Sequence, residues 1–324
     1  MIDQPRDAPP DPDEGEPVES LVASLRAGAR ESLEAVILYG SRLHGARPDR
    51  YSALDLVVIV RDYATFYEHL RAAGELHHSP RLMTALSRVL PPSVVAFTPG
   101  DGEGPLAKCL VVDRRHLERG LGADPPDHFL MSRLVQRVEI VWARDADTRT
   151  WLERLLREAR GNVLSWVAPW LDEPFDAEAL GRRMLEVCYR AELRPEAGNR
   201  AEVIFELQRE HLGRGLAPGL AEAERAGRVR ATGDGYRLVE PPTAADRRRL
   251  RRYFQRSKAR VTARWMKHVV TFANWLPYVT RKVERRTGMK VELTRLEKRW
   301  PLIFLWPRVV RVFLSRPERE GGRR

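Results

Sequence analysis

The chain has 324 residues, of which 43% are hydrophobic, and a formal net charge of +11. This length and composition support a real hydrophobic core in one large or two smaller domains. The first twenty residues lack the apolar core of a secretory signal, and no run of 18 apolar residues predicts a membrane-spanning helix. Because Cys109 and Cys188 fit no metal or redox spacing, we expect buried free thiols in a reducing cytoplasm.

The positive charge is concentrated at the C-terminal end. Residues 247–324 contain 24 Lys and Arg against 5 Asp and Glu, a net charge of +19, so the residues before them carry −8. Such an asymmetry indicates that this end meets an anionic surface, either lipid headgroups or nucleic acid.

In chain order, residues 1–20 are rich in Asp, Glu and Pro and predict a disordered acidic tail. Residues 21–147 are expected to form the first domain, since apolar runs of strand length alternate there with helical patterns. The expected helices cover 21–33 and 63–73, and the expected strands cover 35–39, 54–60, 93–98, 108–112 and 137–142.

From residue 148 the pattern becomes helical, which predicts a helical cap domain over 148–246. Within it, residues 228–238 surround Gly233-Asp234-Gly235 and predict a small hairpin. The fold class is therefore α+β, with a mixed sheet and helices followed by a helical domain.

Residues 247–324 differ in kind from the rest and predict a basic, aromatic membrane-surface segment. Val261, Trp265 and Val269 share one side of a helical wheel, and basic residues such as Arg264 and Lys267 lie elsewhere on it. A basic amphipathic helix with tryptophans beside Lys and Arg is typical of a headgroup layer, so residues 260–315 are expected to contact an anionic membrane. The apolar content of this segment is too high for a solvated nucleic-acid arm, so no nucleic acid is expected.

The most informative motif is a strand that ends in Tyr39-Gly40-Ser41, followed after a loop by a strand that begins near Asp55. This is the layout of a nucleotidyltransferase core, in which Gly-Ser grips a triphosphate and acidic residues on the next strand hold metal. Gly40 allows the backbone to approach a phosphate, Ser41 adds a hydroxyl, and Asp55 offers Mg²⁺ a hard oxygen ligand. Ala53 stands where such cores usually carry a first carboxylate. The alternative interpretation is that these residues form an ordinary strand, turn and strand-end aspartate with no catalytic role.

Other residues complete this candidate site. Lys108 lies on an apolar strand, where lysine is rarely found without a partner such as a phosphate. Asp113, at the end of the same strand, and Glu192 are candidates for further metal ligands. Arg133 and Arg194 could hold phosphate through bidentate hydrogen bonds or form ordinary interdomain salt bridges.

A series of segments over about residues 35–206 follows the order of one known family. The segments are Tyr39-Gly40-Ser41, residues 52–56, residues 66–70 leading to His77-His78-Ser79, residues 108–112, residues 129–134, and residues 189–194 followed by Glu202-Val203. In their order, these segments resemble those of the mitochondrial translocator assembly and maintenance proteins, which are peripheral phosphatidate cytidylyltransferases. The chain departs from the family pattern at His78, Ser132 and Glu192.

The resemblance implies CTP and a lipid phosphate as substrates, CDP-diacylglycerol as product and Mg²⁺ as cofactor. It also implies a cytoplasmic protein bound peripherally to the inner face of a membrane. By its residues, it implies catalytic roles for Asp55, Lys108 and Arg194. It implies nucleotide binding by Tyr39, Gly40, Ser41, His77, Ser79 and Arg133, and metal binding by Asp55 and Glu192, which the strand-end Asp113 would join. For the two adjacent histidines, a surface or helix-capping pair is the alternative.

The missing carboxylate at position 53 is compatible with this chemistry. A phosphate monoester has a second pKa of about 6, so it is largely ionised at neutral pH and needs no general base. Two other classes of function stay open. One is a nucleotidyltransferase with a non-lipid acceptor, and the other is a degenerate, non-catalytic protein that binds membrane or RNA.

Overall fold

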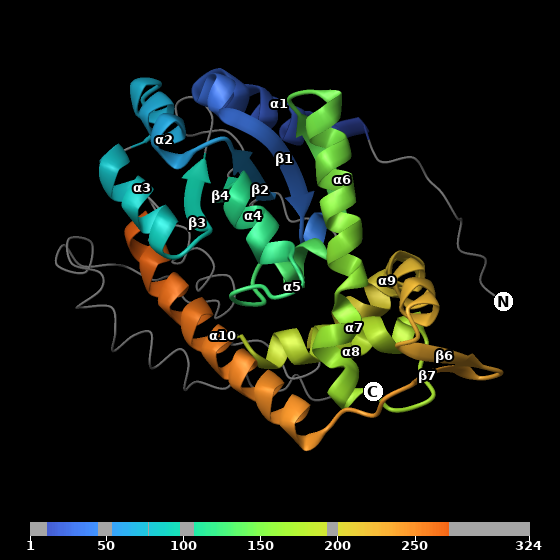
Figure 1. Cartoon of the computed structure of the whole chain (residues 1–324). Helices are drawn as coiled ribbons and strands as arrows, with labels where there is room; N and C mark the ends of the chain where they lie inside the picture. The colour runs from blue at the N-terminus through green and yellow to red at the C-terminus, as the bar shows by residue number, and fades with distance from the viewer. Residues whose placement is uncertain (1–11, 45–53, 77, 98–106, 193–199, 272–324) are drawn as a thin grey trace, which may run out of the picture. The chain divides into compact units, whose positions relative to one another are not determined.

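The computed structural model describes residues 12–44, 54–76, 78–97, 107–192 and 200–271. The chain divides into two units, Met1–Thr271 and Phe272–Arg324, and the second lies outside the described residues. The first unit has an α+β fold in which helices surround a five-stranded mixed sheet and further helices follow it (Figure 1). The predicted fold class is confirmed.

The sheet has the strand order β3-β4-β2-β1-β5, with β2 and β4 parallel and the other pairs antiparallel. All five predicted strands are present, and no end is shifted by more than two residues. They are β1 (Leu33–Tyr39), β2 (Leu54–Val60), β3 (Ser93–Phe97), β4 (Ala107–Asp113) and β5 (Val138–Ala143).

The central strands are buried on both faces. Every residue of β1 is buried, which explains its uninterrupted apolar run. Alternate residues such as Val36 and Leu38 pack into a cluster with helices α1 (Pro12–Ala29) and α2 (Tyr63–Ala72). The opposite face meets α4 (Arg114–Leu121) and α6 (Ala146–Gly161). A scaffold covered in this way holds the ends of its strands in fixed positions.

The N-terminal helix begins earlier than the sequence predicts. Helix α1 starts at Pro12, inside the expected tail, and it ends at Ala29 instead of Leu33. Leu33 instead begins β1, after a short 3-10 turn. The helix extends toward the N-terminus because Val18 and Leu21 add to the stripe that it buries against the sheet.

The remaining helices of the sheet region are α3 (Pro80–Val89) and α5 (Met131–Leu134). After α6 come α7 (Val163–Val167), α8 (Ala177–Arg190) and α9 (Arg200–Arg225). Strands β6 (Val229–Thr232) and β7 (Gly235–Leu238) form the predicted hairpin. Helix α10 (Ala244–Thr271) then runs from the hairpin back toward the five-stranded sheet, where it packs on β3 (Figure 1). Among the described residues, no helix is long and apolar enough to cross a membrane.

Candidate functional site

Three of the predicted site elements meet at one end of the sheet. Tyr39 ends β1 and pairs with Asp55 at the start of β2, and Asp55 pairs in turn with Lys108 at the start of β4. These three residues therefore lie side by side on adjacent strands, with the Gly40-Ser41 turn next to them. The sequence predicted the Gly-Ser turn, Asp55 and Lys108 as site residues, and the sheet topology shows that they are neighbours.

Gly40 fits closely against Asp55. Its φ is +91°, a conformation that residues with a side chain rarely adopt, and a Cβ atom placed there would lie 2.9 Å from Asp55 Oδ2. Ser41 follows, exposed, at the start of a 3-10 turn that is closed by the Leu43 N–H donating to the Gly40 carbonyl at 3.1 Å. Because Gly40 has no side chain, the Asp55 carboxylate can lie directly beside the turn.

Asp55 and Lys108 form a partly open charge pair. Lys108 Nζ lies 3.8 Å from Asp55 Oδ1, and their side chains are 37% and 30% exposed. At this distance and exposure the ion pair adds little to the stability of the fold. Because both side chains are about one third exposed, a charged ligand can reach them. The pair thus supplies one carboxylate and one cation at an open strand end.

The ion pair of Arg133 with Glu192 lies within electrostatic reach of this strand end. Tyr39 is buried, and burial raises the pKa of its phenol, as does the negative charge of Asp55. The charge of Arg133 opposes this rise in the Tyr39 pKa, and that of Glu192 adds to it.

Arg133 is committed to contacts within the protein. One guanidinium nitrogen donates to Glu192 Oε1 at 2.9 Å and to the Phe129 carbonyl at 2.8 Å, and a second donates to Glu192 Oε2 at 3.4 Å. The sequence left a phosphate-binding role and a salt bridge open for Arg133. In the structure Arg133 forms a salt bridge with Glu192, because α5 places the arginine opposite the end of α8.

Glu192 does not lie in a metal-binding group. Arg133 engages both of its oxygens, and His128 Nε2 lies 3.7 Å from Oε1. Among the described residues, no three His, Cys, Asp or Glu side chains gather where they could hold a metal ion.

Asp113 lies away from Asp55 along the strand pair. Asp113 pairs with Val60, five residues along the strand pair from the Asp55–Lys108 row, or roughly 16 Å at the usual rise per residue. It caps α4 by accepting from the His116 N–H at 2.7 Å, so the expectation that Asp113 joins Asp55 at one metal is wrong. Ser79 precedes α3, at the opposite end of that helix from α10. His77, Arg194 and Ala53 lie outside the described residues.

The donor set still fits Mg²⁺ in one respect. Mg²⁺ is commonly bound by one or two carboxylates together with the phosphates of a substrate and water. The open Asp55 carboxylate beside the Gly40 turn provides one such ligand, and a bound polyphosphate and water would add others.

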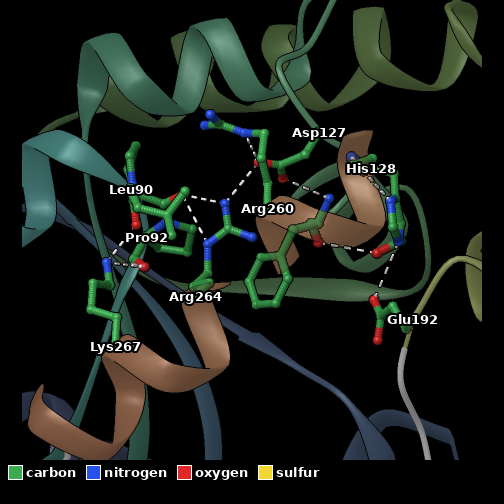
Figure 2. A network of polar contacts seen from close by, with 12 residues as sticks. Leu90, Pro92, Asp127, His128, Glu192, Arg260, Arg264 and Lys267 are labelled. Carbon is green, nitrogen blue, oxygen red and sulfur yellow. Dashed lines mark hydrogen bonds and ion pairs between the residues drawn. The ribbon is translucent and has the colours of Figure 1, made fainter. Parts of the chain in front are cut away.

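Helix α10 contributes a network that the sequence did not reveal (Figure 2). Arg264 and Lys267 were expected on the wet side of a membrane helix, but their side chains are 1% and 7% exposed. Arg264 donates to Asp127 Oδ2 at 2.8 Å and to the Pro91 carbonyl. Lys267 donates to the Leu90 and Pro92 carbonyls at the C-terminal end of α3, where helical carbonyls need donors.

The same helix carries His268 toward the strand-end site. Its Nε2 is buried with no hydrogen-bond partner among the described residues. Burial, and then the positive charge of Lys108, lower the pKa of His268 to about 2. Sequence reasoning missed His268, although Leu250, Phe254, Ser257, Val261 and Arg264 follow a helical stripe that leads to it.

Ser257, His128 and Glu192 lie in a row but cannot form a hydrolytic triad. Ser257 Oγ accepts from the His128 backbone N–H at 2.9 Å and lies beside His128 Nδ1, while Glu192 lies near Nε2. Ser257 and His128 are both fully buried, so no substrate reaches the hydroxyl. The row joins α10 to the end of α8.

Compared with models of known protein families and with curated proteins, the sequence matches none.

Proposed function

We propose that this protein is a nucleotidyltransferase that moves CMP from CTP to a lipid phosphate, with Asp55, Lys108 and the Gly40-Ser41 turn as its reacting site. The observation that carries the proposal is the meeting of the three at one sheet end. Asp55 Oδ1 lies 3.8 Å from Lys108 Nζ, and Gly40 leaves room for Asp55 Oδ2. The ordered resemblance to phosphatidate cytidylyltransferases supports the choice of substrates.

In the proposed reaction, an oxygen of the lipid phosphate attacks the α-phosphorus of CTP. A new P–O bond forms there, and the bond to the β-phosphate oxygen breaks to release pyrophosphate. Because the attacking phosphate is largely ionised at neutral pH, no side chain has to remove a proton. The main obstacle is repulsion between two anions, which cations at the site offset.

Each residue of the site has a role in this scheme. The backbone at Gly40 and the Ser41 hydroxyl hold the polyphosphate, and Lys108 neutralises charge on it. Mg²⁺ held by Asp55 and the phosphates would supply further positive charge at the attacked phosphorus.

The outer face of α10 supports an acceptor that lies at an anionic surface. Its exposed cations are Arg247, Arg248, Arg249, Arg251, Arg252, Arg256 and Lys258. Each such cation near an anionic membrane is worth about 1 kcal/mol of binding. In this proposal α10 meets the membrane with these residues instead of with Arg264 and Lys267, and residues 272–315 extend the contact.

The test is to incubate the full chain with each of the four labelled nucleoside triphosphates, Mg²⁺ and liposomes containing phosphatidate. We expect CDP-diacylglycerol from CTP alone and a loss of at least about a hundredfold in Asp55→Asn, since a key charge-stabilising group is removed.

Asp113→Asn is the matched control. It changes a carboxylate of the neighbouring strand at the opposite end of the sheet, and Asn caps a helix as well as Asp does. Its activity should stay within about twofold of the unmodified chain. No product, or equal activity in Asp55→Asn, would overturn the proposal.

A non-catalytic nucleotide-binding protein is the second candidate, because no metal-binding group of three side chains is present among the described residues. In the same assay it predicts CTP binding, measured by calorimetry, without turnover of any triphosphate.

A further inference from the structure

A cavity that does not include Asp55 or Lys108 lies between α3, α4 and the middle of α10. It has a volume of about 170 Å³, smaller than pockets that bury a whole drug-sized ligand. Its lining residues are Arg88, Val89, Pro91, His116, Arg119, Gly120, Pro126, Asp127, Leu130 and Arg260. The size of the cavity favours a small group over an entire nucleotide.

The lining has an excess of positive charge. Arg88, Arg119 and Arg260 contribute three guanidinium groups, against the single carboxylate of Asp127. That carboxylate is already compensated, because Arg264 donates to it from the buried side at 2.8 Å. The Arg264 guanidinium also holds the pKa of Asp127 below its usual range, so Asp127 stays ionised and is shared between Arg264 and Arg260, while Arg88 and Arg119 add positive charge beyond it.

The arginines differ in how they are held. Arg260 donates to Asp127 Oδ2 at 3.0 Å and is 38% exposed, so it is oriented and still open to a ligand. Arg88 and Arg119 are exposed and make no ion pair with any described residue. Guanidinium groups that converge on one cavity are suited to phosphate oxygens, which accept paired N–H donors.

The inner walls of the cavity are built from packed residues. Gly120 forms part of a wall because a Cβ atom there would lie 2.7 Å from Leu130 Cδ1. His116 is oriented by Nδ1, which lies 2.8 Å from Asp113 Oδ1 and 3.2 Å from Tyr63 Oη. His116 thereby contributes a fixed ring to the lining of the cavity.

From this geometry we infer that the cavity binds a phosphate group through Arg88, Arg119 and Arg260, at a site separate from the one that contains Asp55. Because the ligand would contact α3, α4 and α10 together, it would hold α10 against the sheet. The phosphate could belong to a soluble molecule or to a lipid headgroup, and the chemistry of recognition is the same. The inference does not rest on the proposed function.

The experiment measures binding to the full chain by calorimetry at 150 mM salt. The probes are inorganic phosphate, glycerol phosphate, and phosphatidylcholine vesicles with or without phosphatidate. We expect phosphate-bearing probes to bind and the doubly substituted Arg88→Gln/Arg119→Gln chain to bind at least tenfold more weakly. Both arginines are exposed, so their replacement leaves folding intact, which thermal unfolding checks.

Two controls separate this cavity from other binding. Arg157→Gln removes an exposed arginine of α6 and should bind like the unmodified chain. Lys108→Met removes a cation of the other site, and adding Arg88→Gln/Arg119→Gln to it should weaken the remaining binding at least tenfold. Equal binding by the double variant, no further loss when the double substitution is added to Lys108→Met, or no binding by the unmodified chain would overturn the inference.

The pattern among the probes identifies the source of the phosphate. Binding of the soluble probes with the expected arginine dependence assigns the cavity to a soluble phosphate. Because the exposed cations of α10 also bind anionic vesicles in the proposed function, only vesicle binding that is weakened in Arg88→Gln/Arg119→Gln and kept in Arg157→Gln assigns the cavity to a lipid headgroup.

Discussion

At the scale of single residues, the candidate site depends on the contact between Gly40 and Asp55. The positive φ of Gly40 turns the chain at the end of β1, and the missing side chain leaves space that Asp55 occupies. Gly74 has a similar φ of +80°, but a Cβ atom there would meet nothing within 4 Å. The two glycines therefore share a backbone conformation and differ in their surroundings.

This difference gives a prediction for alanine substitutions. Gly40→Ala and Gly74→Ala should each destabilise the fold by about 1–2 kcal/mol, because a left-handed conformation is strained for alanine. Only Gly40→Ala should also displace the Asp55 carboxylate, so its nucleotide binding should fall by tenfold or more. Denaturant unfolding and nucleotide titration check the two effects, and similar nucleotide binding in both variants would contradict the prediction.

At the scale of elements, α10 is fixed by charged side chains that face inward. Arg264 is buried with Asp127, and its guanidinium carbon lies 4.4 Å from the centre of the Phe129 ring. Arg249, on the exposed side of the same helix, lies 3.7 Å from Asp246. A buried ion pair and an exposed one thus occur on one helix and can be compared directly.

Arg264→Gln should lower the free energy of unfolding by about 3 kcal/mol or more, because it takes the main partner from a buried carboxylate. Arg249→Gln should lower it by less than about 1 kcal/mol, since its pair is exposed to water. Urea unfolding of both variants measures the difference. Equal losses would show that the α10 network does not stabilise the fold.

At the scale of the whole molecule, buried histidines make stability depend on pH. Burial lowers the pKa of His128 to about 4, whereas an unfolded histidine has a pKa near 6.5. Between these values the unfolded chain binds a proton that the folded chain does not, so stability falls as the pH falls from about 6.5 to about 4. Above pH 6.5 this contribution no longer changes.

Replacing His128 with glutamine should remove this part of the acid destabilisation. The predicted loss between pH 6.5 and pH 4 is about 3 kcal/mol greater in the unmodified chain than in His128→Gln. Denaturant unfolding at several pH values measures it, and comparison between the two chains cancels the titration of the other groups. Parallel stability curves would contradict an uncharged His128 in the folded protein.

The sequence by itself determined the local structure. The five strands and the hairpin follow from runs of apolar and turn residues, and the Gly40-Ser41 turn beside Asp55 follows from their spacing. These features depend on neighbours in the chain, so periodicity reveals them. The early start of α1 was missed because its acidic, Pro-rich composition concealed the stripe that packs on the sheet.

Only the tertiary structure decided which distant residues meet. Parallel pairing of β2 with β4 brought Lys108 to Asp55 and placed Asp113 at the opposite end, although both residues lie on one strand. Arg133 donates to Glu192, which is 59 residues further along the chain. Arg264 donates to Asp127, and Lys267 donates to carbonyls after the end of α3. A charged residue can be buried when the fold supplies its partner, and a sequence pattern cannot show where that partner lies.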